Sequence, residues 1–88
     1  MNELRIQHMS FAEGVMTVTF SDGQGVSVSL GNFPRLQSAT PGQLAGWRLI
    51  GRGLGVHWEE LDEDLSVENI LTAYSRAKTR EYAAAHGG

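Results

Sequence analysis

Residues 15–30, which read VMTVTFSDGQGVSVSL, decide the fold. Apolar residues alternate with threonine before the Ser21-Asp22-Gly23 turn and with serine after it. Alternation with a period of two is typical of β-strands, because successive side chains point to opposite faces of a sheet. Two such runs joined by a turn rich in Asp and Gly predict an antiparallel hairpin. One face of this hairpin is apolar and must be covered by another layer, while the other carries small hydroxyl groups.

Further strands are predicted on both sides of this hairpin. Residues 3–7 alternate between polar and apolar types in a short N-terminal strand, and residues 11–14 lead into a turn. Residues 47–50 and 56–58 form a second hairpin, joined by the glycine-rich connection 51–55.

Helical segments separate and follow the hairpins. Phe33-Pro34-Arg35-Leu36 predicts a short helical turn with its two apolar side chains inward, and Thr40-Pro41 predicts an N-cap and first position of another short helix. Ser66 caps the main helix, because an apolar stripe of helical period follows it. The stripe comprises Val67, Ile70, Leu71, Tyr74 and Ala77.

These segments predict an α+β fold, in which a small antiparallel sheet of two hairpins plus an N-terminal strand is covered by one C-terminal helix and one or two short helical turns. We expect one domain over residues 1–79, and a helix end with a frayed tail over residues 80–88. A domain of 88 residues buries a modest core, so dimerisation or a partner would add stability.

Composition excludes several classes of protein. A formal net charge of −3 with seven scattered basic residues argues against a nucleic-acid-binding surface. The absence of cysteine removes disulfides and thiolate chemistry. The N-terminus lacks the apolar run of a signal peptide, and no stretch reaches the roughly 20 apolar residues of a membrane span. We therefore expect a cytoplasmic protein that contacts neither membranes nor nucleic acid directly.

The acidic residues are concentrated in one segment. Six of the ten lie between positions 59 and 68, with no basic residue among them: Glu59, Glu60, Asp62, Glu63, Asp64 and Glu68. Acids at the start of a helix are stabilised by its N-terminal partial charge, so part of the segment is interpreted as the approach to the helix capped by Ser66. The alternative interpretation is a contact surface for a basic partner, most specifically over residues 59–64.

The glycine spacing of the connection resembles a phosphate-binding loop, but its structural context does not. Gly51, Gly53 and Gly55 could expose backbone N–H groups to an anion. Such a loop needs a helix after it, whereas here a strand is predicted. We therefore interpret the glycines as serving unusual φ angles or close packing in a hairpin.

His57 is the residue on which any catalytic or metal hypothesis depends. Beside Glu59 it could form an acid/base pair or a metal site, but it has no second ligand at a defined spacing. The simpler interpretation is a histidine hydrogen-bonded near the edge of the hairpin. The trio 62–64 lacks the alternate ligands, glycine and distal Glu of a calcium loop. We expect no catalytic residue, no metal and no cofactor.

Two tryptophans lie near the ends of the second hairpin and are predicted to pair across it. Core packing is favoured for Trp47 and Trp58, with an exposed anchor as the alternative. Arg48 and Arg52 are their charged neighbours.

Several stretches occur in a fixed order and spacing from Phe11 to Ala73. They are FSDG at 20–23, NFPRL at 32–36, ATP at 39–41, WRLIG at 47–51, Gly53, GVHW at 55–58 and LDEDLSVE at 61–68. In this order they resemble a bacterial domain-of-unknown-function family, number 2442. The resemblance implies a small β-rich domain, and many members look like the antitoxin half of a cassette with a small toxin-like protein. Some members add a helix-turn-helix, for which this chain has too few residues after position 68.

The resemblance and the acidic segment together predict a non-catalytic, antitoxin-like or regulatory protein that binds a basic partner. That partner would be a toxin-like protein or a nucleic-acid-binding complex, and a homodimer is also compatible. The alternative is a mobile-element inhibitor that blocks a host defence complex by nucleic-acid mimicry. The predicted contact residues are Arg48, Arg52, His57, Trp58, Glu59, Glu60, Asp62, Glu63 and Asp64.

Overall fold

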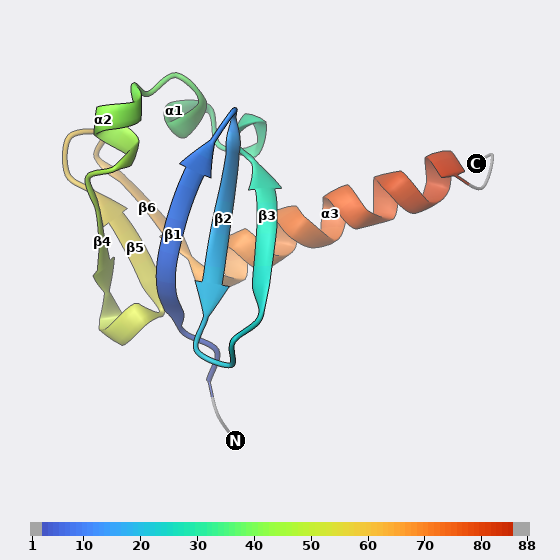
Figure 1. Cartoon of the computed structure of the whole chain (residues 1–88), viewed down its shortest axis with the longest axis horizontal. Helices are drawn as coiled ribbons and strands as arrows, with labels where there is room; N and C mark the ends of the chain where they lie inside the picture. The colour runs from blue at the N-terminus through green and yellow to red at the C-terminus, as the bar shows by residue number, and fades with distance from the viewer. Residues whose placement is uncertain (1–2, 86–88) are drawn as a thin grey trace.

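The computed structural model describes the backbone of residues 3–85 and the side chains of residues 3–77 (Figure 1). Within this part of the chain, six strands form two three-stranded antiparallel sheets of order β1-β2-β3 and β4-β5-β6. The strands are β1 (Ile6–Ala12), β2 (Val15–Phe20), β3 (Gly25–Ser29), β4 (Trp47–Ile50), β5 (Gly55–Trp58) and β6 (Glu63–Ser66). The helices are α1 (Pro34–Gln37), α2 (Pro41–Leu44) and α3 (Val67–Ala85), with 3-10 turns η1 (Leu30–Asn32) and η2 (Gly51–Gly53). The predicted α+β class is confirmed, but the strands form two sheets where one was expected.

The first sheet contains the predicted hairpin of β2 and β3. Met16 and Val18 are fully buried, while the hydroxyls of Thr17 and Ser27 are 3.1 Å apart on the opposite face. The N-terminal strand is displaced from the predicted residues 3–7, since β1 begins at Ile6 and continues to Ala12. A register irregularity between Ile6 and His8 shifts the alternation, so that Ile6 and Met9 both face the core.

The second sheet contains a strand that the sequence did not predict. β6 pairs antiparallel with β5, placing Asp64 opposite His57 and Leu65 opposite Val56. Only Glu68, of the six clustered acids, lies in the first turn of α3. The interpretation of part of the segment as a helix approach therefore holds for Glu68. Residues 59–64, predicted as the contact portion, form a turn and the start of β6.

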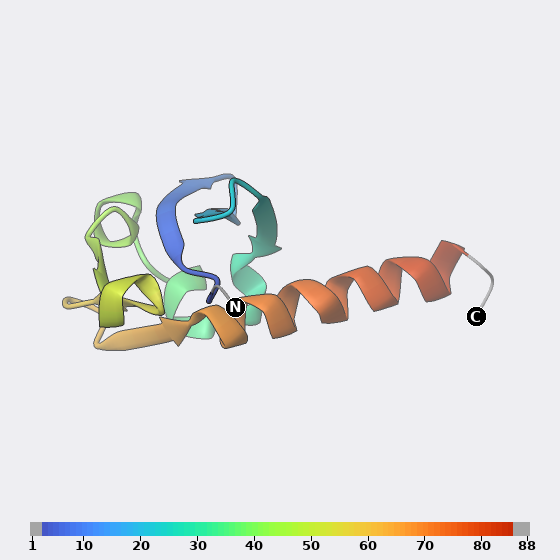
Figure 2. The same ribbon diagram turned by 90° about the horizontal axis from the view of Figure 1, so that it is seen from below.

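Helix α3 begins at the predicted cap. The Asn69 N–H donates to Ser66 Oγ at 3.0 Å, and the Ser66 N–H donates to Asn69 Oδ1 at 2.9 Å. Ile70 and Ala73 are buried, whereas Ala77 is exposed, so the predicted apolar stripe holds only over the first turns. Figure 2 shows why: α3 runs beneath the first sheet and then extends beyond it. Of the helix end and frayed tail predicted over residues 80–88, α3 continues to Ala85, and residues 86–88 lie outside the described residues.

The two short helices are confirmed and close one end of the core. Leu36 of α1 is fully buried. In α2, the Gln43 N–H donates to Thr40 Oγ1 at 3.1 Å, and the Thr40 N–H donates to Gln43 Oε1 at 3.0 Å. None of the helices in the described part of the chain is long and apolar enough to cross a membrane.

Gly53 brings the second hairpin against the first sheet. Its φ is +88°, and a Cβ added there would lie 2.8 Å from the backbone oxygen of Ile6. A side chain therefore has no room at this contact, and its φ also favours glycine. The interpretation of this connection as a close-packed hairpin loop is confirmed at this position.

The contact predicts a difference between two glycine variants. Gly14 also has a positive φ, +78°, but nothing lies within 4 Å of an added Cβ. Gly14→Ala should cost about 1–2 kcal/mol of unfolding free energy through backbone strain alone. Gly53→Ala should cost about 2–5 kcal/mol, because the steric clash adds to that strain. Urea denaturation measures the unfolding free energy of each variant, and an equal decrease in the two variants would contradict the close contact at Gly53.

Candidate binding site on the second sheet

The outer face of the second sheet carries a row of charged side chains from all three strands. Val56 and Trp58 of β5 point into the core, so His57 between them points to the outer face. Its cross-strand partners are Arg48 on β4 and Asp64 on β6. This pairing places two basic side chains and one acidic side chain, from three neighbouring strands, side by side.

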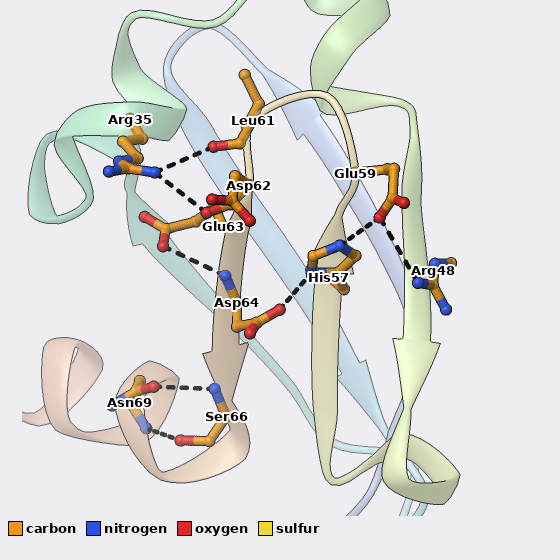
Figure 3. A network of polar contacts seen from close by, with 10 residues as sticks. All are labelled: Arg35, Arg48, His57, Glu59, Leu61, Asp62, Glu63, Asp64, Ser66 and Asn69. Atoms are coloured by element: carbon orange, nitrogen blue, oxygen red, sulfur yellow. Dashed lines mark hydrogen bonds and ion pairs between the residues drawn. The ribbon is translucent and has the colours of Figure 1, made fainter.

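The charged row is joined through the imidazole of His57 (Figure 3). Nδ1 contacts Asp64 Oδ1, Nε2 lies 2.6 Å from Glu59 Oε2, and Arg48 Nη2 lies 3.7 Å from the same Glu59 oxygen. A carboxylate can only accept hydrogen bonds. Both ring nitrogens must therefore donate, which requires the doubly protonated imidazolium.

The electrostatics of the row agree with this protonation state. The hydrogen bond to Asp64, followed by that to Glu59, raises the pKa of His57 above its ordinary value of 6.5. The hydrogen bond from His57 lowers the pKa of Glu59, with the positive charges of His57 and Arg48 adding to the effect. The side chain of His57 is 16% exposed, against 79% for Glu59 and 68% for Asp64, so the cation is shielded more than its partners.

A turn at the end of the row presents further carboxylates. We call Glu59, Glu60, Asp62, Glu63 and Asp64 the acidic corner, since they surround the connection from β5 to β6. Arg35 of α1 holds this corner through its main chain: Nη1 donates to the carbonyl oxygens of Leu61 at 3.3 Å and Asp62 at 3.1 Å. Asp62 has a φ of +49°, a conformation that few non-glycine residues adopt. The turn is thus fixed from outside the sheet (Figure 3).

The structure brings together seven of the nine predicted contact residues. Arg48, His57 and the acidic corner lie on or beside one face of the second sheet.

The other two predicted contact residues lie elsewhere. Trp58 is 1% exposed and donates its indole N–H to the Leu44 carbonyl at 3.0 Å. The favoured core packing is thus confirmed for Trp58, and its place among the predicted contact residues was wrong. Its predicted cross-strand pairing with Trp47 is confirmed. Arg52 lies in η2, at the opposite end of the hairpin from the acidic corner, because β4 and β5 run antiparallel.

Arg35 is a site residue that the sequence did not reveal. It contacts the acidic corner across 26 and 27 positions of sequence, and no local pattern connects the two. The described residues contain no group of three or more His, Asp or Glu side chains with a geometry that could hold a metal ion. The row therefore offers fixed charge and hydrogen-bonding groups on an open face.

The family profile described as a protein of unknown function, DUF2442, matches residues 7–75. The chain belongs to the DUF2442 family. A crystal structure of a protein of unknown function from Rhodospirillum rubrum is similar, with 27% identity and a TM-score of 0.71 over 81% of this chain and 88% of the other. The solution structure of the uncharacterised protein CV0863 from Chromobacterium violaceum has 24% identity and a TM-score of 0.67, covering 80% and 66%. No curated protein matches the chain.

The imidazolium of His57 predicts that stability falls as pH rises. Because the folded-state pKa lies above 6.5, the stabilisation is complete below that value and is lost as pH passes through the raised pKa. Wild-type unfolding free energy should therefore decrease as pH rises above about 6.5, relative to His57→Gln, which lacks the titrating group. Urea denaturation at several pH values measures the difference.

His8→Gln is the matched control, since it removes an exposed imidazole that contacts the ring of Trp47. This variant should keep the pH dependence of the wild type. A His57→Gln profile parallel to that of the wild type would contradict the imidazolium bridge.

Proposed function

We propose that this DUF2442 protein is a non-catalytic protein-binding module, antitoxin-like or regulatory, that binds a basic surface of a partner through the acidic corner. The observation that carries the proposal is that the acidic corner is held in a fixed shape by Arg35. A set of carboxylates that only solvated the surface would not need such support.

The charges of the acidic corner are only partly balanced within the molecule. Arg48 and His57 lie within ion-pair distance of Glu59 or Asp64. Among the described residues, no cation lies within that distance of the three remaining carboxylates, which belong to Glu60, Asp62 and Glu63. Arg35 is near, but it donates to backbone oxygens. Three negative charges therefore remain for a partner.

Preorganisation is what makes such a surface selective. A loop that must be ordered on binding loses part of its interaction energy to that ordering. Here the hydrogen bonds of Arg35 and the pairing of β6 with β5 order the corner beforehand. Complementary charge then accelerates encounter with a basic partner and disfavours acidic ones. A cytoplasmic, toxin-like protein whose active site or nucleic-acid-binding surface is basic fits these requirements.

Charge removal at the acidic corner tests the proposal. The variant is Glu60→Gln, Asp62→Asn and Glu63→Gln, in which asparagine keeps a residue suited to the positive φ at position 62. It should bind the protein that co-purifies with the tagged wild-type chain about tenfold or more weakly at low salt, mainly through slower association. Surface plasmon resonance at two salt concentrations measures the association rate separately from the dissociation rate.

A control with the same net charge removes three acids elsewhere: Glu3→Gln, Asp22→Asn and Glu68→Gln. At the higher salt concentration, this control should stay within about twofold of the wild type, because charges far from the contact are screened there. Equal weakening by both variants, or weakening by neither, would contradict a role of the acidic corner. Failure of the tagged chain to recover any protein partner would count against the proposed function as a whole.

A further inference from the structure

A groove of about 460 Å³ runs along the C-terminal half of β1. Residues 9–14 line it on the side of the first sheet, and α2 with its flanking residues, together with Trp47, lines it on the other; Leu30 and Gln37 complete the lining. Its lining is mainly apolar, with Phe11, Leu44 and Trp47 among the side chains. Glu13 is the charged residue among those that line it, at the end where β1 turns into β2.

The wall formed by β1 is an open strand edge. β1 lies at the edge of the first sheet and pairs with β2 on one side. The turn between them has two residues, Glu13 and Gly14, with φ values of 51° and 78°. In such a hairpin the residues flanking the turn form a hydrogen-bonded pair, and hydrogen-bonded pairs then alternate along the strands.

This alternation fixes which backbone groups face the groove. Ala12 and Ser10 are hydrogen-bonded to β2, so the N–H and C=O groups of Met9 and Phe11 point away from it. Within the described residues, no backbone or side-chain hydrogen bond outside the β1–β2 ladder involves these groups. Unpaired N–H and C=O groups along an apolar groove favour an additional strand, because another main chain presents acceptors and donors at the same spacing.

The occupant must be a segment that is free on both sides. The open edge lies inside the groove, with α2 and Trp47 opposite it, so the β1 edge of a second copy would be kept away by its own α2 and Trp47. Figure 1 shows α2 beside this edge of the first sheet. A single extended peptide has no such flanking wall. Its apolar side chains at alternate positions would contact the groove, and a Lys or Arg would lie near Glu13.

We propose that this groove binds an extended peptide segment of a partner protein as an added antiparallel or parallel strand on β1, with apolar side chains at alternate positions and a basic residue at the Glu13 end. This inference goes beyond the acidic corner, which lies on the second sheet. The two surfaces share one end of the molecule, since the indole of Trp58 on β5 donates to Leu44 of α2. One partner could therefore occupy both.

The open edge is tested by amide hydrogen exchange of the free protein. The amides of Met9 and Phe11 should exchange faster than those of Ser10 and Ala12, although the Met9 side chain is only 2% exposed. Slow exchange at Met9 and Phe11 in the free protein would mean that the edge is already paired and would overturn the proposal.

Binding is tested with a library of displayed linear peptides selected against the wild-type chain, and the most enriched peptide then serves as the probe. Ala45→Trp fills the groove at an exposed helix-end position and should weaken the peptide about tenfold or more. Ala77→Trp makes the same change on exposed α3, outside the groove, and should stay within about twofold. N-methylation of the peptide at alternate residues should abolish binding, because added strands depend on main-chain hydrogen bonds.

The proposal would be overturned if the selected peptides lacked alternating apolar residues, or if the two tryptophan variants weakened peptide binding equally. It would also be overturned if the peptide tolerated N-methylation at every position. The same holds if Ala45→Trp abolished self-association of the chain and left peptide binding unchanged. The variant of the acidic corner should bind the selected peptide as the wild type does. A failure of the acidic corner and a failure of the groove are therefore distinguishable.

Discussion

The burial of Trp58 is the constraint on which the rest of the structure depends. The centroid of its ring lies 6.3 Å from that of Phe11 in the first sheet, in an edge-to-face arrangement, and its indole N–H donates to the Leu44 carbonyl. One side chain thus joins both sheets to α2. Because neighbours along a strand point to opposite faces, burying Trp58 also places His57 on the outer face of the second sheet. The charged row and the acidic corner follow from that orientation.

The outer face of the second sheet combines a rigid scaffold with an excess of negative charge. The imidazolium of His57 connects β5 to β6 by contacting Asp64, and it shares Glu59 with Arg48. These internal pairs keep the acids closest to the sheet from repelling one another. The remaining carboxylates lie at the turn, where Arg35 supports the main chain. Such an arrangement suits binding, because its charge is fixed in place before any partner arrives.

The first sheet has unpaired main-chain groups, in contrast to the unbalanced charges of the second sheet. Its β3 edge lies near α3, while β1 has main-chain groups that face an apolar groove. Open edges are generally shortened, charged or covered in proteins that remain monomeric. Here α2 and Trp47 narrow the approach to the edge without pairing with it. The edge is thereby protected against another sheet and remains accessible to a single extended segment.

The sequence alone determined both hairpins, the caps of the helices and the acidic segment, because period-two alternation, turn residues and capping side chains act locally. It did not determine β6, since acidic residues have low strand propensity and Glu63–Ser66 becomes a strand only by pairing with β5. Tertiary structure also decided which groups Trp58 contacts in the core, that Arg52 lies away from the acidic corner, and that Arg35 supports this corner. Each of these depends on contacts between distant segments, and the pattern around a residue does not encode which distant segment it will meet.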